Sequence, residues 1–249
     1  MELKEYKNLA ERETFFWWNV GRRRILEDTL KRYVLSSHLE ILDVGCGPGG
    51  NILFLKKFGN VTGIDSSEEA LSFARTRGFL KIAKSGGENL PFPDRSFDLV
   101  SVLDVLEHIE HDTRALTEIF RVLKKNGILL LTVPAYLWMW SAHDEALHHK
   151  RRYVRKELHE KIKAAGFSVE YASYFIIPSI PFRALKIAIS TIKKLLHISV
   201  DTTPKTDDVI LPAWLNTFFI WWLALEKSYM KFFPIPFGSS LLVVAKKPL

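Results

Sequence analysis

The chain has 249 residues, 47% of them hydrophobic and 25% charged, which is the composition of a globular protein and excludes a disordered chain. Its single cysteine, Cys46, excludes an internal disulfide framework and suits a reducing compartment, while the formal charge of +7 favours an anionic partner, either nucleic acid or a membrane surface. The N-terminus MELKEYKNLAERE is charged throughout and does not have the pattern of a signal peptide, so we expect a cytoplasmic protein.

Apolar runs suited to strands alternate with amphipathic helical stretches from about 39 to 175, which is typical of a parallel sheet wrapped by helices. A helix over FFWWNVGRRRIL (15–26) is predicted to precede them. In chain order we then predict strands over 39–45, 60–65, 80–84, 97–104, 128–134, 167–175 and 239–247. The predicted helices are 49–59, ending at Gly59; 67–78, capped by Ser66 or Ser67; 112–127, capped by Asp112 and closed by Gly127; and 154–166.

The segment 176–238 has an unusual composition. RALKIAISTIKKLLH (183–197) would place basic residues on one helical face and aliphatic residues on the other. This pattern is typical of a helix in a membrane interface, or of one packed on its own domain with its lysines in water. VILPAWLNTFFIWWLAL (209–225) is uncharged, but it is short for a bilayer span and is interrupted by Pro212 and Asn216. An aromatic and cationic belt accompanies it, so we predict a docking surface rather than a span: Trp221, Trp222, Lys227, Tyr229, Lys231, Phe232 and Phe233.

A glycine-rich turn, ILDVGCGPGG (41–50), joins the first strand to its helix. Its glycines allow a tight turn and close approach to a ligand, and the helix N-terminus offers free N–H groups to a negative group. Dinucleotide-binding enzymes use such a turn as well. Two features favour a nucleoside cofactor other than a dinucleotide. One is the pair Asp43 and Cys46 within the motif, and the other is Asp65 at the end of the second strand, where a carboxylate can accept both ribose hydroxyls.

Four ordered motifs resemble those of the class I S-adenosylmethionine-dependent methyltransferases, specifically the large group that contains the quinone-pathway methyltransferases: DVGCGPG, GID, ENLPFPDRSFDLVSVLDVLEHI and RVLKKNGILLLTVP. The resemblance covers about 39–175 and the closing strand. It implies an α/β fold with a Rossmann-like seven-stranded sheet, mostly parallel with the last strand antiparallel. It also implies S-adenosylmethionine as the cofactor, with its amino-acid end on the glycine turn, its ribose on Asp65 and its adenine beside ENLPF.

The cofactor-binding residues that this resemblance implies are Arg22, Asp43, Gly45, Cys46, Gly47, Asp65, Ser66, Glu88, Asn89, Leu90, Asp104 and His108. The family commonly has Asp where this chain has Gly86, so we expect Glu88, Asn89 and backbone groups to recognise the adenine. Arg22 would grip the cofactor carboxylate through its guanidinium; a basic patch on a solvated helix is the alternative. Asp104 and His108 follow the fourth strand at the carboxyl edge of the sheet, where ligands bind. A structural role for His108 stays open, and Glu107 and His111 are predicted to be surface or helix-start groups.

Three further segments resemble a narrower microbial subgroup: FWW…GRRRIL, HD…HH…RRY, and the tail with ILPAWLN and FPIPFGSSLL. We associate that subgroup with envelope and lipid-linked glycan pathways. This resemblance implies a lipid or glycolipid substrate.

The segment SAHDEALHHKRRY (141–153) leaves the fifth strand at the same edge as the cofactor loops and is predicted to face the substrate. His143 is the predicted catalytic base, because an oxygen nucleophile needs one with a pKa near neutral, and Asp144 is predicted to orient it. The predicted substrate-binding residues are Trp140, His148, His149, Arg151, Arg152 and Tyr153, the last three as a clamp for a phosphate or carboxylate. Helix-cap or surface roles are the alternative. A metal is disfavoured because these histidines lack the i,i+4 spacing of a helical site.

The prediction is a single methyltransferase domain, 1–249, with a helical cap (1–36), a cofactor-binding core (37–175), an apolar insert (176–238) and a closing strand (239–249). It would methylate a lipid, isoprenoid or lipid-linked sugar, most simply at oxygen, on the inner face of the membrane, with the insert as the peripheral membrane contact. A soluble methyltransferase for a small molecule or RNA and a non-catalytic cofactor-binding subunit are the alternatives. No DNA partner is expected, and for RNA no dedicated binding module is visible.

Overall fold

The structure is a computed structural model that describes residues 10–34, 38–195 and 211–249, apart from the side chains of residues 190 and 193–195. Seven strands form one sheet in the order β3-β2-β1-β4-β5-β7-β6. The strands are β1 (Leu39–Val44), β2 (Gly59–Asp65), β3 (Ile82–Lys84), β4 (Phe97–Leu103), β5 (Leu123–Pro134), β6 (Ser168–Phe175) and β7 (Ser240–Lys246). β7 runs antiparallel between β5 and β6, and the pairings among β1 to β5 are parallel. The predicted fold class is therefore confirmed.

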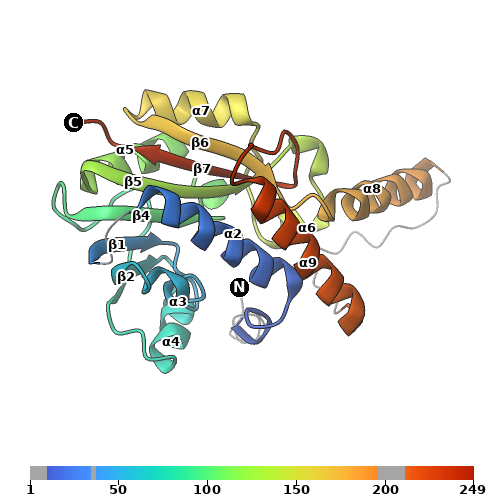
Figure 1. The fold of residues 1–249 in the computed structure, drawn as a ribbon, viewed down its shortest axis with the longest axis horizontal. Coiled ribbons are helices and arrows are strands. Elements are labelled where there is room, and N and C mark those ends of the chain that lie inside the picture. The colour runs from blue at the N-terminus through green and yellow to red at the C-terminus, as the bar shows by residue number, and fades with distance from the viewer. Residues whose placement is uncertain (1–9, 35–37, 196–210) are drawn as a thin grey trace.

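Helices cover both faces of the sheet (Figure 1). They are α2 (Trp17–Tyr33), α3 (Ile52–Leu55), α4 (Glu68–Thr76), α5 (Asp112–Val122), α6 (Ala142–Ala146), α7 (Arg155–Ala164), α8 (Ser179–Leu195) and α9 (Ala213–Tyr229), with 3₁₀ turns η1 (Leu106–His108) and η2 (Leu137–Met139). Alternate strand residues point to opposite faces. Ile41 and Leu99 therefore pack with α2, α3 and α9, whereas Leu42 and Val100 pack with α5 and α7.

Two predicted helices are shorter than expected because their last residues belong to strands. Gly59 starts β2 opposite Leu39, so the helix predicted over 49–59 is only the short α3. α5 ends at Val122, and the following residues enter β5, where Leu123 pairs with Phe97. The ammonium of Lys247 donates to the carbonyl oxygens of Phe120 (2.6 Å) and Leu123 (2.8 Å), which satisfies this helix end without the predicted Gly127 cap.

The predicted N-cap of α4 is confirmed, whereas the predicted N-cap of α5 is wrong. Ser67 caps α4 by accepting from the Ala70 N–H, as predicted. His111, not Asp112, is the N-cap residue of α5, which confirms a helix-start role for His111. The Asp112 carboxylate is instead engaged by the side chains of Tyr153 (2.9 Å) and Lys161 (2.5 Å).

The uncharged segment 209–225 forms most of α9, which packs along α2. A Cβ at Gly21 would lie 2.2 Å from Leu223, so glycine permits the close approach of the two helices. Asn216, which interrupts the apolar run, accepts a hydrogen bond from the Trp17 N–H (2.9 Å) and thereby caps the start of α2. No helix among the described residues is long and apolar enough to cross a bilayer.

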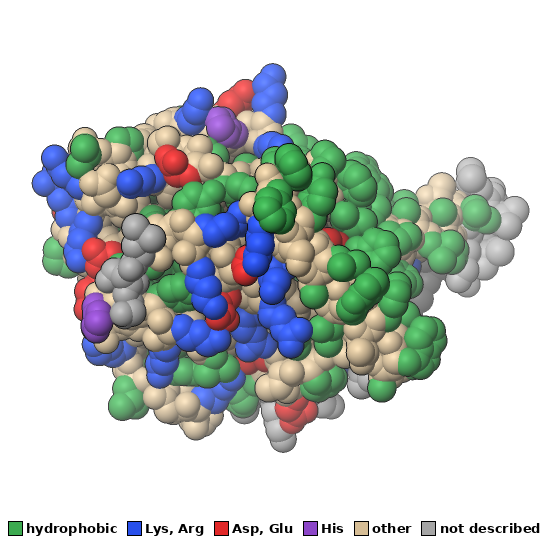
Figure 2. All heavy atoms as spheres, in the orientation of Figure 1, with side chains coloured by type: hydrophobic (Ala, Val, Ile, Leu, Met, Phe, Trp, Pro, Cys, Tyr) green, Lys and Arg blue, Asp and Glu red, His purple; other side chains and the backbone are tan. Residues whose placement is uncertain are grey.

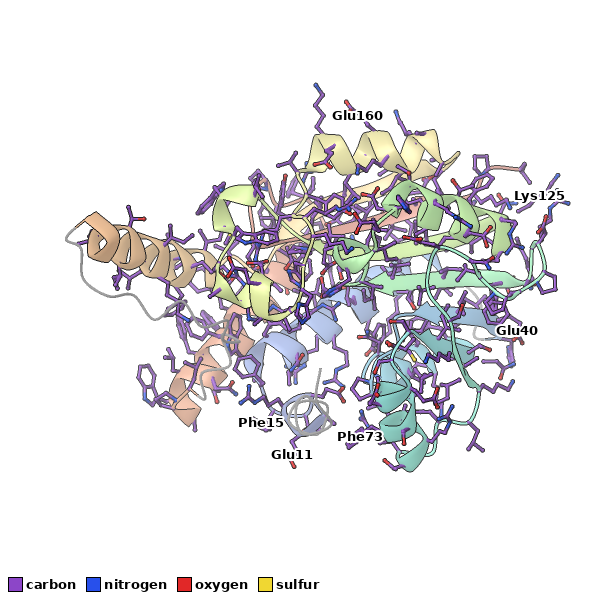
Figure 3. The ribbon with its side chains drawn as sticks, turned by 180° about the vertical axis from the view of Figure 1, so that it is seen from behind. Glu11, Phe15, Glu40, Phe73, Lys125 and Glu160 are labelled. Carbon is purple, nitrogen blue, oxygen red and sulfur yellow. The ribbon has the colours of Figure 1, made fainter. Side chains whose placement is uncertain are left out.

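The loops of interest lie at one end of the sheet. Figure 3 labels Glu40 and Lys125 at the end where β1 and β5 begin, and Phe15 away from it. At the opposite, carboxyl end, η1 follows β4, and η2 and α6 follow β5. α8 projects beyond this end (Figure 1). The predicted basic and aliphatic faces of 183–197 include residues that lie outside the described side chains: Ser190, Lys193, Lys194, Leu195, Leu196 and His197.

Candidate active site

The glycine turn between β1 and α3 leaves open space for a ligand. Gly47 has a φ of +54°, and no described atom lies within 4 Å of a Cβ built there. Its N–H donates to Asp65 Oδ2 (2.8 Å), and the Ser67 N–H donates to Asp65 Oδ1 (2.9 Å), so Asp65 is fixed at the end of β2. The exposed Ser66 follows it. Both carboxylate oxygens keep a lone pair for further donors, which suits ribose hydroxyls.

Asp43 and Cys46 are buried on either side of Gly45. Ser101 Oγ donates to Asp43 Oδ1 (2.7 Å), while Asp43 Oδ2 is buried without a hydrogen-bond partner among the described residues. Burial raises the pKa of this carboxyl to about 7. A ligand with a hydrogen-bond donor at the turn would satisfy Oδ2, so the site fits the amino-acid end of a cofactor. The Cys46 thiol packs inward against Gly63 and burial raises its pKa, which leaves only the Cys46 backbone for the predicted cofactor contact.

Arg22 reaches from α2 to the carboxyl edge of the sheet. The residue is only 7% exposed, and its guanidinium pairs with Asp104 Oδ2 (2.6 Å) and donates to Thr132 Oγ1 (3.0 Å) in β5. It also lies 3.4 Å from Asn51 Oδ1, beside the glycine turn. The structure therefore brings Arg22 and Asp104 together next to the turn, and the solvated-patch alternative for Arg22 is excluded. Sequence reasoning missed Thr132, although a polar residue within the apolar run ILLLTVP is a visible signal.

The segment predicted to lie beside adenine follows β3. Glu88 Oε1 accepts from the His111 N–H (2.8 Å), and the Leu90 N–H donates to Glu118 (2.9 Å) while its side chain is buried. Asn89 is exposed, and a Cβ at Gly86 would meet nothing within 4 Å. This segment is thus anchored to α5 with open space at Gly86, and adenine recognition by Glu88, Asn89 and Leu90 stays a prediction.

Asp144 is the centre of the 141–153 segment. It is fully buried and accepts from Arg152 Nε (2.7 Å), from His149 Nδ1 (2.8 Å) and from the Ser141 N–H (3.0 Å), the last completing a capping box at α6. Burial alone would raise the pKa of Asp144, but these hydrogen bonds hold it well below its usual range. The acid predicted to orient His143 therefore holds His149 and Arg152.

The predicted anion clamp turns inward. Arg152 is 6% exposed and also donates to the Ala135 carbonyl (2.9 Å). Tyr153 is fully buried and donates to Asp112, to which Arg151 Nη1 also pairs at 3.1 Å. Arg152 and Tyr153 thus have internal partners, as buried polar groups require, and their predicted substrate contacts stay predictions.

The histidines remain near the carboxyl edge. The His149 ring contacts two others: its centroid is 4.7 Å from that of His108 and 6.5 Å from that of His143. His148 is exposed with a φ of +56°, and Trp140 is half-buried beside η2. Glu107, predicted to be a surface or helix-start group, lies in the short helix η1 but is fully buried, and its own backbone carbonyl accepts from the Lys150 N–H (2.9 Å).

Comparisons with known proteins agree with this geometry. The methyltransferase domain family matches residues 42–131. The chain is 33% identical over 135 residues to a protein of Mycolicibacterium smegmatis named "Probable S-adenosylmethionine-dependent methyltransferase", covering 53% of this chain and 52% of that protein. It is 31% identical to an uncharacterised protein of Methanocaldococcus jannaschii (56% of this chain, 69% of that one) and 30% identical to a demethylmenaquinone methyltransferase of Staphylococcus aureus (56% and 62%). Except for the Methanocaldococcus protein, the chain thus spans about half to three fifths of these relatives.

A solved structure resembles the whole chain. It is the complex between the Haloferax volcanii Trm112 methyltransferase activator and a candidate methyltransferase, with a TM-score of 0.64, 19% identity, and coverage of 99% of this chain and 94% of that one. At this identity the likeness concerns the fold.

Proposed function

Because the chain contains a methyltransferase domain and is similar to a protein named as an S-adenosylmethionine-dependent methyltransferase, we propose that it transfers a methyl group from S-adenosylmethionine to an oxygen of a lipid, isoprenoid or lipid-linked sugar at a membrane surface. The sulfonium of the cofactor supplies an activated methyl group. The acceptor oxygen forms a bond to the methyl carbon as the S–C bond breaks, which leaves a thioether and releases the hydroxyl proton to a base. His143 is the predicted base, and Asp43, Asp65 and Arg22 are predicted to hold the cofactor.

The observation that carries the lipid acceptor is an apolar face beside the predicted acceptor side of the site. We define this face by exposed large apolar side chains of η2, α8, α9 and the segment after α9: Leu137, Trp138, Phe182, Leu185, Ile189, Ile192, Trp214, Phe218, Trp221, Trp222, Leu225, Phe232 and Phe233. Figure 2 shows hydrophobic side chains gathered over α9 and towards α8, bordered by Lys and Arg side chains near α2. Contiguous apolar surface of this kind marks a membrane or partner contact.

The apolar face is joined to the acceptor-side segment by Arg183. This residue of α8 donates to the Met139 carbonyl (3.1 Å) and to Ser141 Oγ (3.2 Å), and it lies 3.4 Å from Asp144. Phe182 contacts Phe219 of α9, with ring centroids 5.6 Å apart. A lipid held against α8 and α9 would therefore enter beside residues 141–149. The name of the Staphylococcus relative, which gives demethylmenaquinone as its acceptor, supports an apolar acceptor for this chain.

Methyl labelling tests the proposal. Native extract is incubated with the purified protein and S-adenosylmethionine labelled in its methyl group, and the organic and aqueous phases are separated. We expect label in the organic phase with the intact protein. We expect little label with Asp65→Ala, because this variant lacks a predicted contact to the cofactor ribose. Label confined to the aqueous phase would contradict the lipid acceptor. A protein that binds the cofactor and labels neither phase would favour the non-catalytic alternative.

A further inference from the structure

One cluster of titratable side chains forms where η1 meets the segment after α6. Glu107, His108 and His149 each offer one donor atom, and these atoms all lie within 4.8 Å of one another. We propose that these three residues bind a divalent transition-metal ion, of which Zn²⁺ is the simplest example. The histidines of 141–153 lack the i,i+4 spacing of a helical metal site, but this cluster joins residues from two segments, η1 and the segment after α6.

Glu107 provides the first independent observation. Its side chain is fully buried, and neither carboxylate oxygen has a hydrogen-bond partner among the described residues. A buried carboxylate without a donor is strongly unfavourable, and Asp104 nearby adds negative charge, whereas Arg22 and Arg152 offset part of it from a distance. A cation bound at the carboxylate would satisfy both oxygens.

The geometry around His149 suits a metal ligand. Nδ1 is bound to the Asp144 carboxylate at 2.8 Å, which fixes the ring and turns Nε2 toward Glu107. A carboxylate on the far nitrogen is the usual partner of a metal-binding histidine. Nε2 lies 4.0 Å from Glu107 Oε1, too far for a hydrogen bond. Two ligands that each lie about 2 Å from a tetrahedral ion are about 3.3 Å apart, so the Glu107 and His149 side chains would have to approach by about 0.7 Å to share one ion.

The donor set selects the type of ion. Two imidazole nitrogens and one carboxylate oxygen favour Zn²⁺ or a similar transition metal, whereas Mg²⁺ and Ca²⁺ prefer oxygen ligands. Three protein ligands leave a coordination position open, and His108 is exposed, so the cluster is accessible from solvent.

The cluster lies next to the cofactor turn. Val105, two residues before Glu107, fills the space beside Gly45, where a Cβ would lie 2.3 Å from it. An oxygen of the acceptor could occupy the open position, where an ion lowers the pKa of a hydroxyl. This role rests on the proposed function, whereas ion binding itself does not.

Ion binding by the full chain, stripped of metal with a chelator, tests the site. We expect calorimetry to show one Zn²⁺ bound per chain and the melting temperature to rise, with no comparable effect of Mg²⁺ at the same concentration. Glu107→Gln and His149→Gln should each weaken Zn²⁺ binding about a hundredfold or more. His148→Asn, on the same loop and compatible with a positive φ, should bind Zn²⁺ like the unchanged protein.

The circular dichroism spectrum and the affinity for S-adenosylhomocysteine report whether each variant is folded. Unchanged Zn²⁺ affinity in folded Glu107→Gln and His149→Gln would overturn the site, as would a folded, cofactor-binding protein that takes up no Zn²⁺. Zn²⁺ binding in a protein that methylates no lipid would uphold the site and count against the proposed function alone.

Discussion

At the scale of single residues, two buried arginines show how environment decides a role. Arg22 pairs with Asp104, which is partly exposed, and lies beside the glycine turn. Arg152 has its donors directed at Asp144 and a backbone carbonyl inside the protein. Arg22 is therefore a cation next to the glycine turn, whereas Arg152 stabilises the interior of the protein.

Arg22→Ala should weaken cofactor binding. Loss of a charge-assisted contact to the cofactor carboxylate is worth about 1.5–3 kcal/mol, so we expect about a tenfold to hundredfold lower affinity for S-adenosylhomocysteine by calorimetry. Arg24→Ala is the matched control, because Arg24 lies two residues further along α2 with an exposed side chain. Equal affinities for the two variants would remove Arg22 from the cofactor site.

His143→Ala tests the predicted base. We expect turnover to fall about a hundredfold or more while cofactor affinity stays intact, because general base catalysis contributes about 10²–10⁴-fold. His159→Ala on α7 is the control. If His143→Ala abolished cofactor binding together with turnover, His143 would have a structural role instead.

At the scale of elements, α9 holds the junction between β6 and α8 through one carboxylate. Glu226 accepts from the N–H groups of Ile176 (2.7 Å) and Ile177 (3.0 Å). Ile176 has a φ of +62°, an unfavourable conformation for a β-branched residue. Burial raises the pKa of Glu226 from 4.5 to about 7, despite these two hydrogen bonds.

The raised pKa predicts a pH dependence of stability. The folded protein holds a proton on Glu226 that the unfolded chain releases between pH 4.5 and about 7. The stabilisation is therefore complete below this window and is lost as the pH rises through it, by roughly 3 kcal/mol. Urea unfolding at pH 4.5 and 7 should show the free energy of unfolding falling by this amount relative to Glu226→Gln. Glu160→Gln, on the outer side of α7 (Figure 3), should behave like the unchanged protein; an identical pH slope in Glu226→Gln would refute the shift.

At the scale of the whole molecule, the apolar insert is both core and surface. Phe219 and Leu223 of α9 are buried against α2, whereas Trp221 is 56% and Phe232 78% exposed. Deleting 176–238 would therefore unfold the helical layer as well as remove the apolar face. Substitutions of exposed residues separate the two effects.

The double variant Trp221→Glu with Phe232→Glu should lose membrane binding. Each side chain removed from the interface forfeits about 1.5–3 kcal/mol of apolar burial, so we expect recovery with anionic vesicles in flotation to fall about tenfold or more. Leu80→Glu, at a residue that is 84% exposed and lies near β3, is the control. If the double variant floats as well as Leu80→Glu, the apolar face does not contact lipid.

The sequence by itself determined the sheet, its covering helices and the cofactor turn. Strand and helix periodicities and the local chemistry of glycine act within a few residues, so DVGCGPG and Asp65 could be placed without coordinates. Tertiary structure alone decided which side chains of the segment 141–153, predicted to face the substrate, are internal. Asp112 and Asp144 draw in Tyr153 and Arg152, because a buried carboxylate must find donors wherever the fold supplies them. The same packing buries Glu107 beside His149, a pairing of distant residues that sequence spacing cannot show.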